Sequence, residues 1–256
     1  MTLNLLKILL FLYKNREPIS TLDLNERISK DKYKISIYNF NSKNNFASKY
    51  LANSCDKEHI VHFLVEHGVN VNGGMEIPLR RASDVGNLNV VKYLVKHGAD
   101  INKITDFEEY PSALFDACNR GHKTIVKYLI EKGANISIRN YNEITPLLLA
   151  CGNRNENLVK YLIEHGADVN MEDCDRKTPL ICAYYNYNKN VVKYLIEQGA
   201  DPRSISWVFP YRTALMVACK CGHDPPVKYL IGCGADINEI NDDGDTALTI
   251  ACKKKQ

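Results

Sequence analysis

The chain has 256 residues, a formal net charge of +3 and nine cysteines. One compact core of this length would lie near the upper size of a single domain. The small net charge does not indicate nucleic acid as a general partner. The apolar run at the amino terminus is too short to span a bilayer, so we expect no membrane span.

Residues 1–45 precede the recognisable repeats and are predicted as a separate segment. The run from Leu3 to Leu12 is apolar apart from Asn4 and Lys7, which predicts a helical cap or the second helix of a degenerate repeat. A signal peptide is disfavoured, because no basic residue precedes the run and no small-residue cleavage site follows it. The polar stretch from Glu17 to Asn44 is interpreted as an insertion.

This first segment carries four more basic than acidic side chains. A basic arm from Lys7 to Lys43 is therefore an alternative site for nucleic acid, whose phosphates attract such side chains. The helix followed by Pro18-Ile19-Ser20 could also belong to a winged-helix fragment. That interpretation is disfavoured, since no clear recognition helix follows.

From residue 46 onward, one pattern recurs along the chain. Its landmark alanines and glycines are spaced by 33 or 35 residues, apart from a first glycine step of 30. The alanines are Ala82, Ala117, Ala150, Ala183, Ala218 and Ala251, and the glycines are Gly68, Gly98, Gly133, Gly166, Gly199 and Gly234. A fixed period of this size predicts a stack of small supersecondary units.

The copy that begins at Thr145 shows what one unit contains. Thr145 before Pro146 predicts a capped helix start, and the leucines that follow give a short first helix. A second amphipathic helix follows, and Gly166 ends it, because a left-handed residue there needs no Cβ. One such pair of helices cannot bury its own apolar face, so neighbouring units must cover it.

The copies differ mainly at the two ends. In the first, about residues 46–72, Lys49 replaces the motif leucine, as expected of an end unit. Five further copies cover about 74–102, 109–137, 143–170, 177–202 and 212–238. A last half unit starts at Asp245 and has a first helix only, so its apolar face should be half covered.

Thr-Pro-Leu-x-x-Ala, a glycine turn and Val-Val-Lys-Tyr-Leu-Ile-Glu-x-Gly-Ala-Asp together resemble the ankyrin repeat. The resemblance implies an all-α ankyrin-repeat solenoid with short β-hairpin loops, about six repeats and a terminal half repeat. It assigns residues 46–256 to one ankyrin repeat domain. It also implies a non-catalytic protein that binds other macromolecules, usually proteins.

Two residue types recur at fixed positions of the units. Four cysteines directly follow a landmark alanine, namely Cys118, Cys151, Cys219 and Cys252. They lie one unit apart, too far for disulfides, so we expect reduced, buried thiols. The repeated Lys-Tyr-Leu of the second helices could bind nucleic acid, but the structural interpretation is favoured. Glu131, Glu164 and Glu197 follow the lysines by four residues and should neutralise them.

We find no catalytic, cofactor-binding or metal-binding constellation in the sequence. Cys219, Cys221 and His223 have the residue types of zinc ligands, yet they fall in the ordinary first helix and turn of a repeat. His67, His97 and His165 precede helix-ending glycines, where the ring can meet the last carbonyl groups.

Two loops are longer than the others by two residues, and both are rich in aromatic side chains. Aromatic and arginine side chains dominate binding hot spots, and loops on a rigid scaffold can vary freely. The predicted partner-binding residues are Phe107, Glu109, Tyr110, Arg139, Tyr141, Arg176, Trp207, Phe209 and Tyr211. The alternative is that Trp207 and Phe209 fold back and cover their own repeat.

These features predict a protein-interaction module or adaptor that binds its partner on a concave surface of loops and first helices. A substrate-recognition subunit of a ubiquitin-ligase-type complex is the first alternative, although we find no clear second docking motif. Nucleic-acid binding through the basic arm is the second. We expect a monomer in the cytoplasm or nucleus that needs no cofactor.

Overall fold

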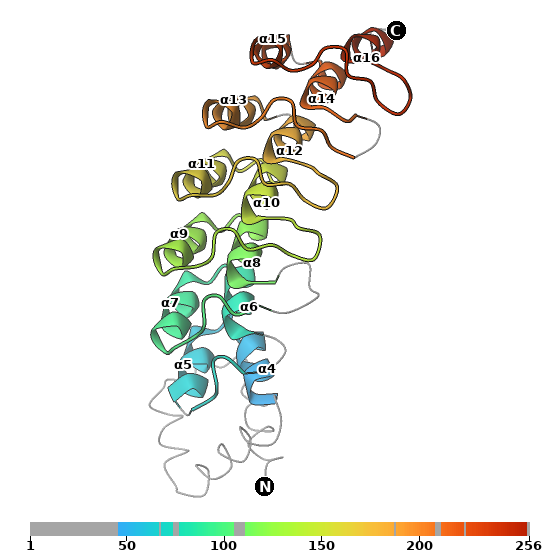
Figure 1. The fold of residues 1–256 in the computed structure, drawn as a ribbon. Helices are drawn as coiled ribbons and strands as arrows, with labels where there is room; N and C mark the ends of the chain where they lie inside the picture. Colours follow the sequence, from blue (N-terminus) through green and yellow to red (C-terminus); the bar gives the residue numbers. More distant parts are fainter. Residues whose placement is uncertain are drawn as a thin grey trace, which may run out of the picture. The chain divides into compact units, whose positions relative to one another are not determined.

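The computed structural model describes residues 46–66, 68–73, 77–104, 111–186, 188–207, 211–222 and 224–254. Over these ranges the chain forms thirteen helices, α4 to α16, and no strand (Figure 1). The predicted all-α class is therefore confirmed. The predicted β-hairpins are reduced to tight turns and, in the described residues, one isolated antiparallel bridge between Ile205 and Thr213.

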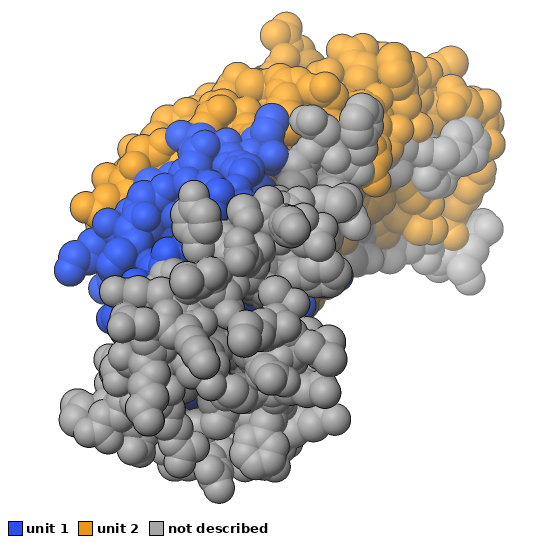
Figure 2. Space-filling view, turned by 90° about the horizontal axis from the view of Figure 1, so that it is seen from below, with its two compact units in different colours: residues 1–105 blue, residues 106–256 orange. Residues whose placement is uncertain are grey.

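The chain divides into two compact units, residues 1–105 and 106–256 (Figure 2). Unit 1 contains α4 (Phe46–Asn53), α5 (Glu58–Glu66), α6 (Pro78–Val85) and α7 (Leu88–Lys96). Within this unit α4 packs on α6, and α5 packs on α7. The predicted boundary between residues 45 and 46 falls where the described residues begin, so it stays a prediction.

Unit 2 contains four helix pairs and one further helix. The pairs are α8 (Ala113–Arg120) with α9 (Lys123–Glu131), α10 (Pro146–Gly152) with α11 (Glu156–Glu164), α12 (Pro179–Tyr185) with α13 (Lys189–Glu197), and α14 (Ala214–Cys221) with α15 (Asp224–Gly232). The further helix is α16 (Ala247–Lys254). The first helices α8, α10, α12, α14 and α16 form one column, and the second helices form another (Figure 1).

The first helices begin as the sequence predicts. The Thr145 hydroxyl accepts a hydrogen bond from the backbone N–H of Leu148 at 3.3 Å, with Pro146 at the start of the helix. Thr178 caps α12 in the same way, through the N–H of Ile181 at 3.3 Å. The motif leucines and landmark alanines of α10 and α12 are at most 1% exposed. These residues form the core between neighbouring repeats.

Gly133 and Gly166 end the second helices α9 and α11 with φ of 89° and 95°. A Cβ at either position would meet no atom within 4 Å. The left-handed backbone, and not a lack of space, therefore requires glycine.

In unit 2 each pair of helices is followed by a loop that projects from the column of first helices, and we call these loops fingers (Figure 1). Their described residues are 134–145, 167–178, 200–207 with 211–213, and 235–246. Three of them share one turn, in which an Asn or Asp side chain accepts from the backbone N–H groups two and four residues on. The caps of these turns are Asn140, Asp173 and Asn241. These hydrogen bonds from nearby backbone N–H groups stabilise the turn at each of the three finger tips.

Candidate partner-binding edge

The tips of the fingers in unit 2 are joined to one another, and we call this row the finger edge. It consists of residues 139–144, 172–177, 205–207 with 211–213, and 240–245. The backbone N–H of Cys174 donates to the carbonyl oxygen of Asn142 at 3.0 Å, and that of Trp207 donates to the carbonyl oxygen of Asp175 at 2.8 Å. Arg212 and Asp242 form an ion pair at 3.3 Å. Contacts therefore run from each tip to the next.

Trp207 is the most exposed of the predicted aromatic residues that the structure describes. Its side chain is 62% exposed, and the Arg176 guanidinium lies 5.8 Å from the ring centre. The ring of Trp207 is therefore not packed into the core of its own repeat. Phe209, its predicted companion, lies outside the described residues.

Tyr141 and Arg139 lie on the first finger of this row. Tyr141 is 60% exposed. Arg139 pairs with Glu143 across the turn and also contacts the sulfur of Met171 on the next finger. On that next finger the same two positions hold the opposite charges, since Glu172 pairs with Arg176 at 3.1 Å. Exposed ion pairs of this kind stabilise by about 1 kcal/mol or less, so their main effect is to orient the side chains.

Tyr211 behaves differently from Trp207. It is half-buried, and the ammonium group of Lys220 on α14 lies 5.5 Å from its ring centre. On the preceding finger, Lys177 lies 5.4 Å from the ring centre of Tyr185 on α12. These two contacts hold the fingers against the first helices. Tyr211 and Tyr185 thus help to attach the fingers to the first helices, whereas Trp207 is exposed to solvent.

The other predicted residues of the site, Phe107, Glu109 and Tyr110, lie outside the described residues. The structure brings Arg176 and Trp207 into contact. It places Arg139 and Tyr141 on the finger that precedes that of Arg176. Sequence reasoning missed the backbone ladder through Asn142 and Asp175. The fixed period was the available signal, because it puts these two residues at the same position of successive units.

A family model described as "Ankyrin repeats (3 copies)" matches residues 4–105, 114–206 and 209–256. The chain belongs to the ankyrin repeat family. The first matched range includes most of the segment predicted as a cap or degenerate repeat. No curated protein matches the chain. Ankyrin repeats are generally protein–protein interaction modules and are typically non-enzymatic.

The lysines and tyrosines of the second ankyrin helices contact one another between repeats. Lys127 lies 5.0 Å from the ring centre of Tyr161, and Lys160 lies 5.6 Å from that of Tyr194. The predicted neutralisation is only partly right. Lys193 does pair with Glu197 at 3.6 Å.

Lys160 pairs instead with a residue four positions before it. Its partner is Glu156 at 2.8 Å, where the sequence had suggested Glu164. Glu156 also accepts a hydrogen bond from the Asn190 amide of the next repeat at 3.1 Å. The hydrogen bond from Lys160 and that from Asn190 together hold the pKa of Glu156 below its usual value. The carboxylate of Glu156 thus links Lys160 to the next repeat.

Of the repeated cysteines, only two fully meet the expectation of a buried thiol. Cys118 and Cys151 are 0% exposed, and burial raises the pKa of both thiols. Cys219 is half-buried and Cys252 is exposed, which corrects the prediction for Cys252. Cys252 lies on α16, the last helix of the described residues. All four are free thiols, as expected.

The predicted capping histidines are confirmed at two of three positions, and the third, His67, lies outside the described residues. The Nδ1 atoms of His97 and His165 lie 2.8 Å from the carbonyl oxygens of Tyr93 and Tyr161.

In the part of the chain that the structure describes, no group of three or more His, Cys, Asp or Glu side chains could hold a metal ion. No helix among the described residues is both long enough and apolar enough to cross a membrane.

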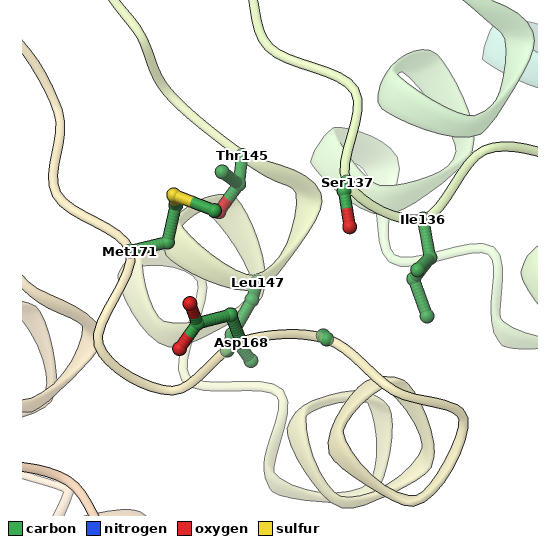
Figure 3. A pocket seen from close by; sticks show the side chains of 7 residues that line it. Ile136, Ser137, Thr145, Leu147, Asp168 and Met171 are labelled. Carbon is green, nitrogen blue, oxygen red and sulfur yellow. The ribbon is translucent and has the colours of Figure 1, made fainter.

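A recess near the finger edge is too small for an organic ligand. It lies between two fingers, beside the start of α10, and its volume is about 10 Å³ (Figure 3). The lining residues are Ile136, Ser137, Thr145, Leu147, Ala167, Asp168 and Met171. Such a volume holds about one water molecule. The recess itself therefore offers no site for an organic ligand.

Proposed function

We propose that the chain is a non-catalytic adaptor whose finger edge, with the exposed sides of the first helices of unit 2, binds a partner protein. The observation that supports this most directly is the exposure of Trp207 and Tyr141 on tips that are hydrogen-bonded to their neighbours. Exposed aromatic rings contribute most of the energy at many protein interfaces. Here they are held on a braced edge, so little conformational freedom is left to lose on binding.

The adaptor is proposed to act as a monomer in the cytoplasm or nucleus. Free thiols at Cys118 and Cys151 suit a reducing compartment. The substrate-recognition and nucleic-acid alternatives depend on a second docking motif and on residues 1–45, respectively. No contact described above favours either of them, and both stay predictions.

The test is affinity capture from a lysate of the source cells with three proteins. These are the wild-type chain, a Tyr141→Ser/Trp207→Ser variant, and a Tyr229→Ser/Ile231→Ser control. The control removes apolar side chains from α15 that are 39% and 47% exposed but lie away from the fingers. We expect a partner that the wild type and the control retain and the finger variant loses, with unchanged circular dichroism. Equal recovery with all three proteins would contradict the proposed site.

A further inference from the structure

The fingers of unit 2, whose tips form the finger edge, differ in charge from the chain that carries them. Over residues 134–145, 167–178, 200–207, 211–213 and 235–246 the sequence has eleven acidic and five basic side chains. The whole chain, by contrast, has a net charge of +3. The acidic excess is thus concentrated on the fingers, where the exposed aromatic rings also lie.

The five basic side chains of these fingers already contact groups within the chain. Four form ion pairs, namely Arg139 with Glu143, Arg176 with Glu172, Arg203 with Asp201 and Arg212 with Asp242. The fifth, Lys177, lies over the ring of Tyr185. Asp175 and Asp243 are exposed near the tips and take part in none of these contacts. A partner that approaches the edge therefore meets uncompensated negative charge.

The aromatic rings favour the same partner chemistry. A cation over the face of Trp or Tyr is attracted by the ring, and the attraction grows when water is excluded. The Trp207 ring already holds one guanidinium, that of Arg176, at 5.8 Å. Its 62% exposed surface, together with that of Tyr141, leaves room for further contacts.

We propose that the finger edge recognises a Lys- or Arg-rich segment of the partner protein. The segment's cationic groups face Asp175 and Asp243, and its side-chain stems pack on Trp207 and Tyr141. This inference rests on the proposed function and adds the chemical class of the partner. Nucleic acid does not fit this edge, because phosphates would face the same carboxylates.

The test uses short fluorescein-labelled peptides and measures binding by fluorescence anisotropy. One peptide is rich in Lys, Arg and Leu, and the other has Glu in place of every Lys and Arg. The edge variant is Asp175→Asn/Asp243→Asn, which keeps the backbone carbonyl that accepts from Trp207. The matched control is Glu131→Gln/Glu164→Gln, which changes the net charge equally but on exposed positions of the second helices.

We expect the basic peptide to bind and the acidic one not to bind. The edge variant and Trp207→Ser should each weaken binding by about fivefold or more, and the control by less than about twofold. Added salt should weaken binding of the wild type, since exposed charges are screened. Equal binding of both peptides, or equal weakening by the edge variant and the control, would overturn the inference.

The lysate experiment separates this inference from the proposed function. If the captured partner depends on Trp207 but binds through an acidic or neutral segment, or if it is a nucleic acid, the inference fails. If the partner binds through an acidic or neutral segment, the finger edge is still the binding surface and the proposed function stands. If capture does not depend on Trp207, the proposed function fails as well.

Discussion

Two sets of equivalent positions in unit 2 behave in opposite ways. The motif leucines of successive first helices, Leu147, Leu180 and Leu215, are identical in type and at most 1% exposed. The first tip residues of successive fingers are all exposed and all different, namely Tyr141, Cys174, Trp207 and Asp242. Both sets recur with the period of the repeat. Packing between neighbouring repeats requires leucine at the first set, whereas the tip residues are free to differ. Any specificity for a partner should therefore come from the tips.

The largest contrast should appear in thiol chemistry, because cysteine occurs at both kinds of position. Cys151 is fully buried in the helix column and Cys174 is exposed at a tip. We expect iodoacetamide to alkylate Cys174 on the order of 100-fold faster than Cys151, which reacts only after local opening. Mass spectrometry of the labelled peptides measures both rates. Similar rates would show that the helix column is not closed as described.

The pH dependence of that reaction has a defined sign. Partial desolvation, together with Asp175 and Asp173, raises the pKa of the Cys174 thiol above its usual value. The thiolate is the reactive form, so its fraction should keep increasing as the pH rises past the ordinary thiol pKa. Replacing Asp175 with Asn removes one of the charges that disfavour the thiolate. The rate profile of that variant should therefore shift to lower pH, and an unshifted profile would contradict this.

In stability, Leu180→Ala should be the most damaging of the single changes considered. Leu180 is 0% exposed between neighbouring repeats. We expect its truncation to lower the free energy of unfolding by about 2–5 kcal/mol. Trp207→Ser, at the finger edge, should cost less than about 1 kcal/mol. Urea denaturation followed by circular dichroism measures both, and equal losses would mean that Trp207 is part of the core.

Thr178→Ala should have an intermediate effect. It removes the hydroxyl that accepts from the N–H of Ile181 at the start of α12 and should cost about 1 kcal/mol. Thr178→Ser keeps an acceptor at the same place and serves as the control. Urea denaturation of both variants distinguishes a lost cap from lost packing. A loss as large with Ser as with Ala would point to packing of the methyl group.

The smallest effect is expected at the last motif leucine. Leu248 on α16 occupies the same repeat position as Leu147 and Leu180, yet it is 71% exposed. Leu248→Ala should therefore change the free energy of unfolding by less than about 0.5 kcal/mol, because surface substitutions rarely do more. Urea denaturation beside Leu180→Ala checks this. A loss above about 2 kcal/mol would show that the repeat motif itself, and not burial, determines the cost.

Much of this architecture could be predicted because similar residues begin and end the helices of several repeats. Thr145 with Pro146 begins a helix and Gly166 ends one, and the same signals recur at Thr178 with Pro179 and at Gly199. Contacts between repeats were harder to predict. Lys160 pairs with Glu156, whose carboxylate also accepts from Asn190 of the next repeat, and the sequence does not show how residues of neighbouring repeats lie relative to one another.

The site was predictable only in part. Sequence pattern marked Tyr141, Arg176 and Trp207 as candidates, because they are aromatic or arginine residues in loops. It did not reveal that backbone hydrogen bonds join the tips, since every residue has a backbone carbonyl group and only the repeat period marks the positions of Asn142 and Asp175. The left-handed backbone of Arg176, with φ of 57°, was also hidden, because glycine is the usual residue at such a turn position.

The most direct test of the central claim is amide hydrogen exchange of the chain alone and with its captured partner. We expect slower exchange over residues 139–144, 172–177, 205–207, 211–213 and 240–245 when the partner is bound. Exchange in the second helices α11 and α13 should not change. Protection confined to those helices, or to residues 1–45, would contradict binding at the finger edge.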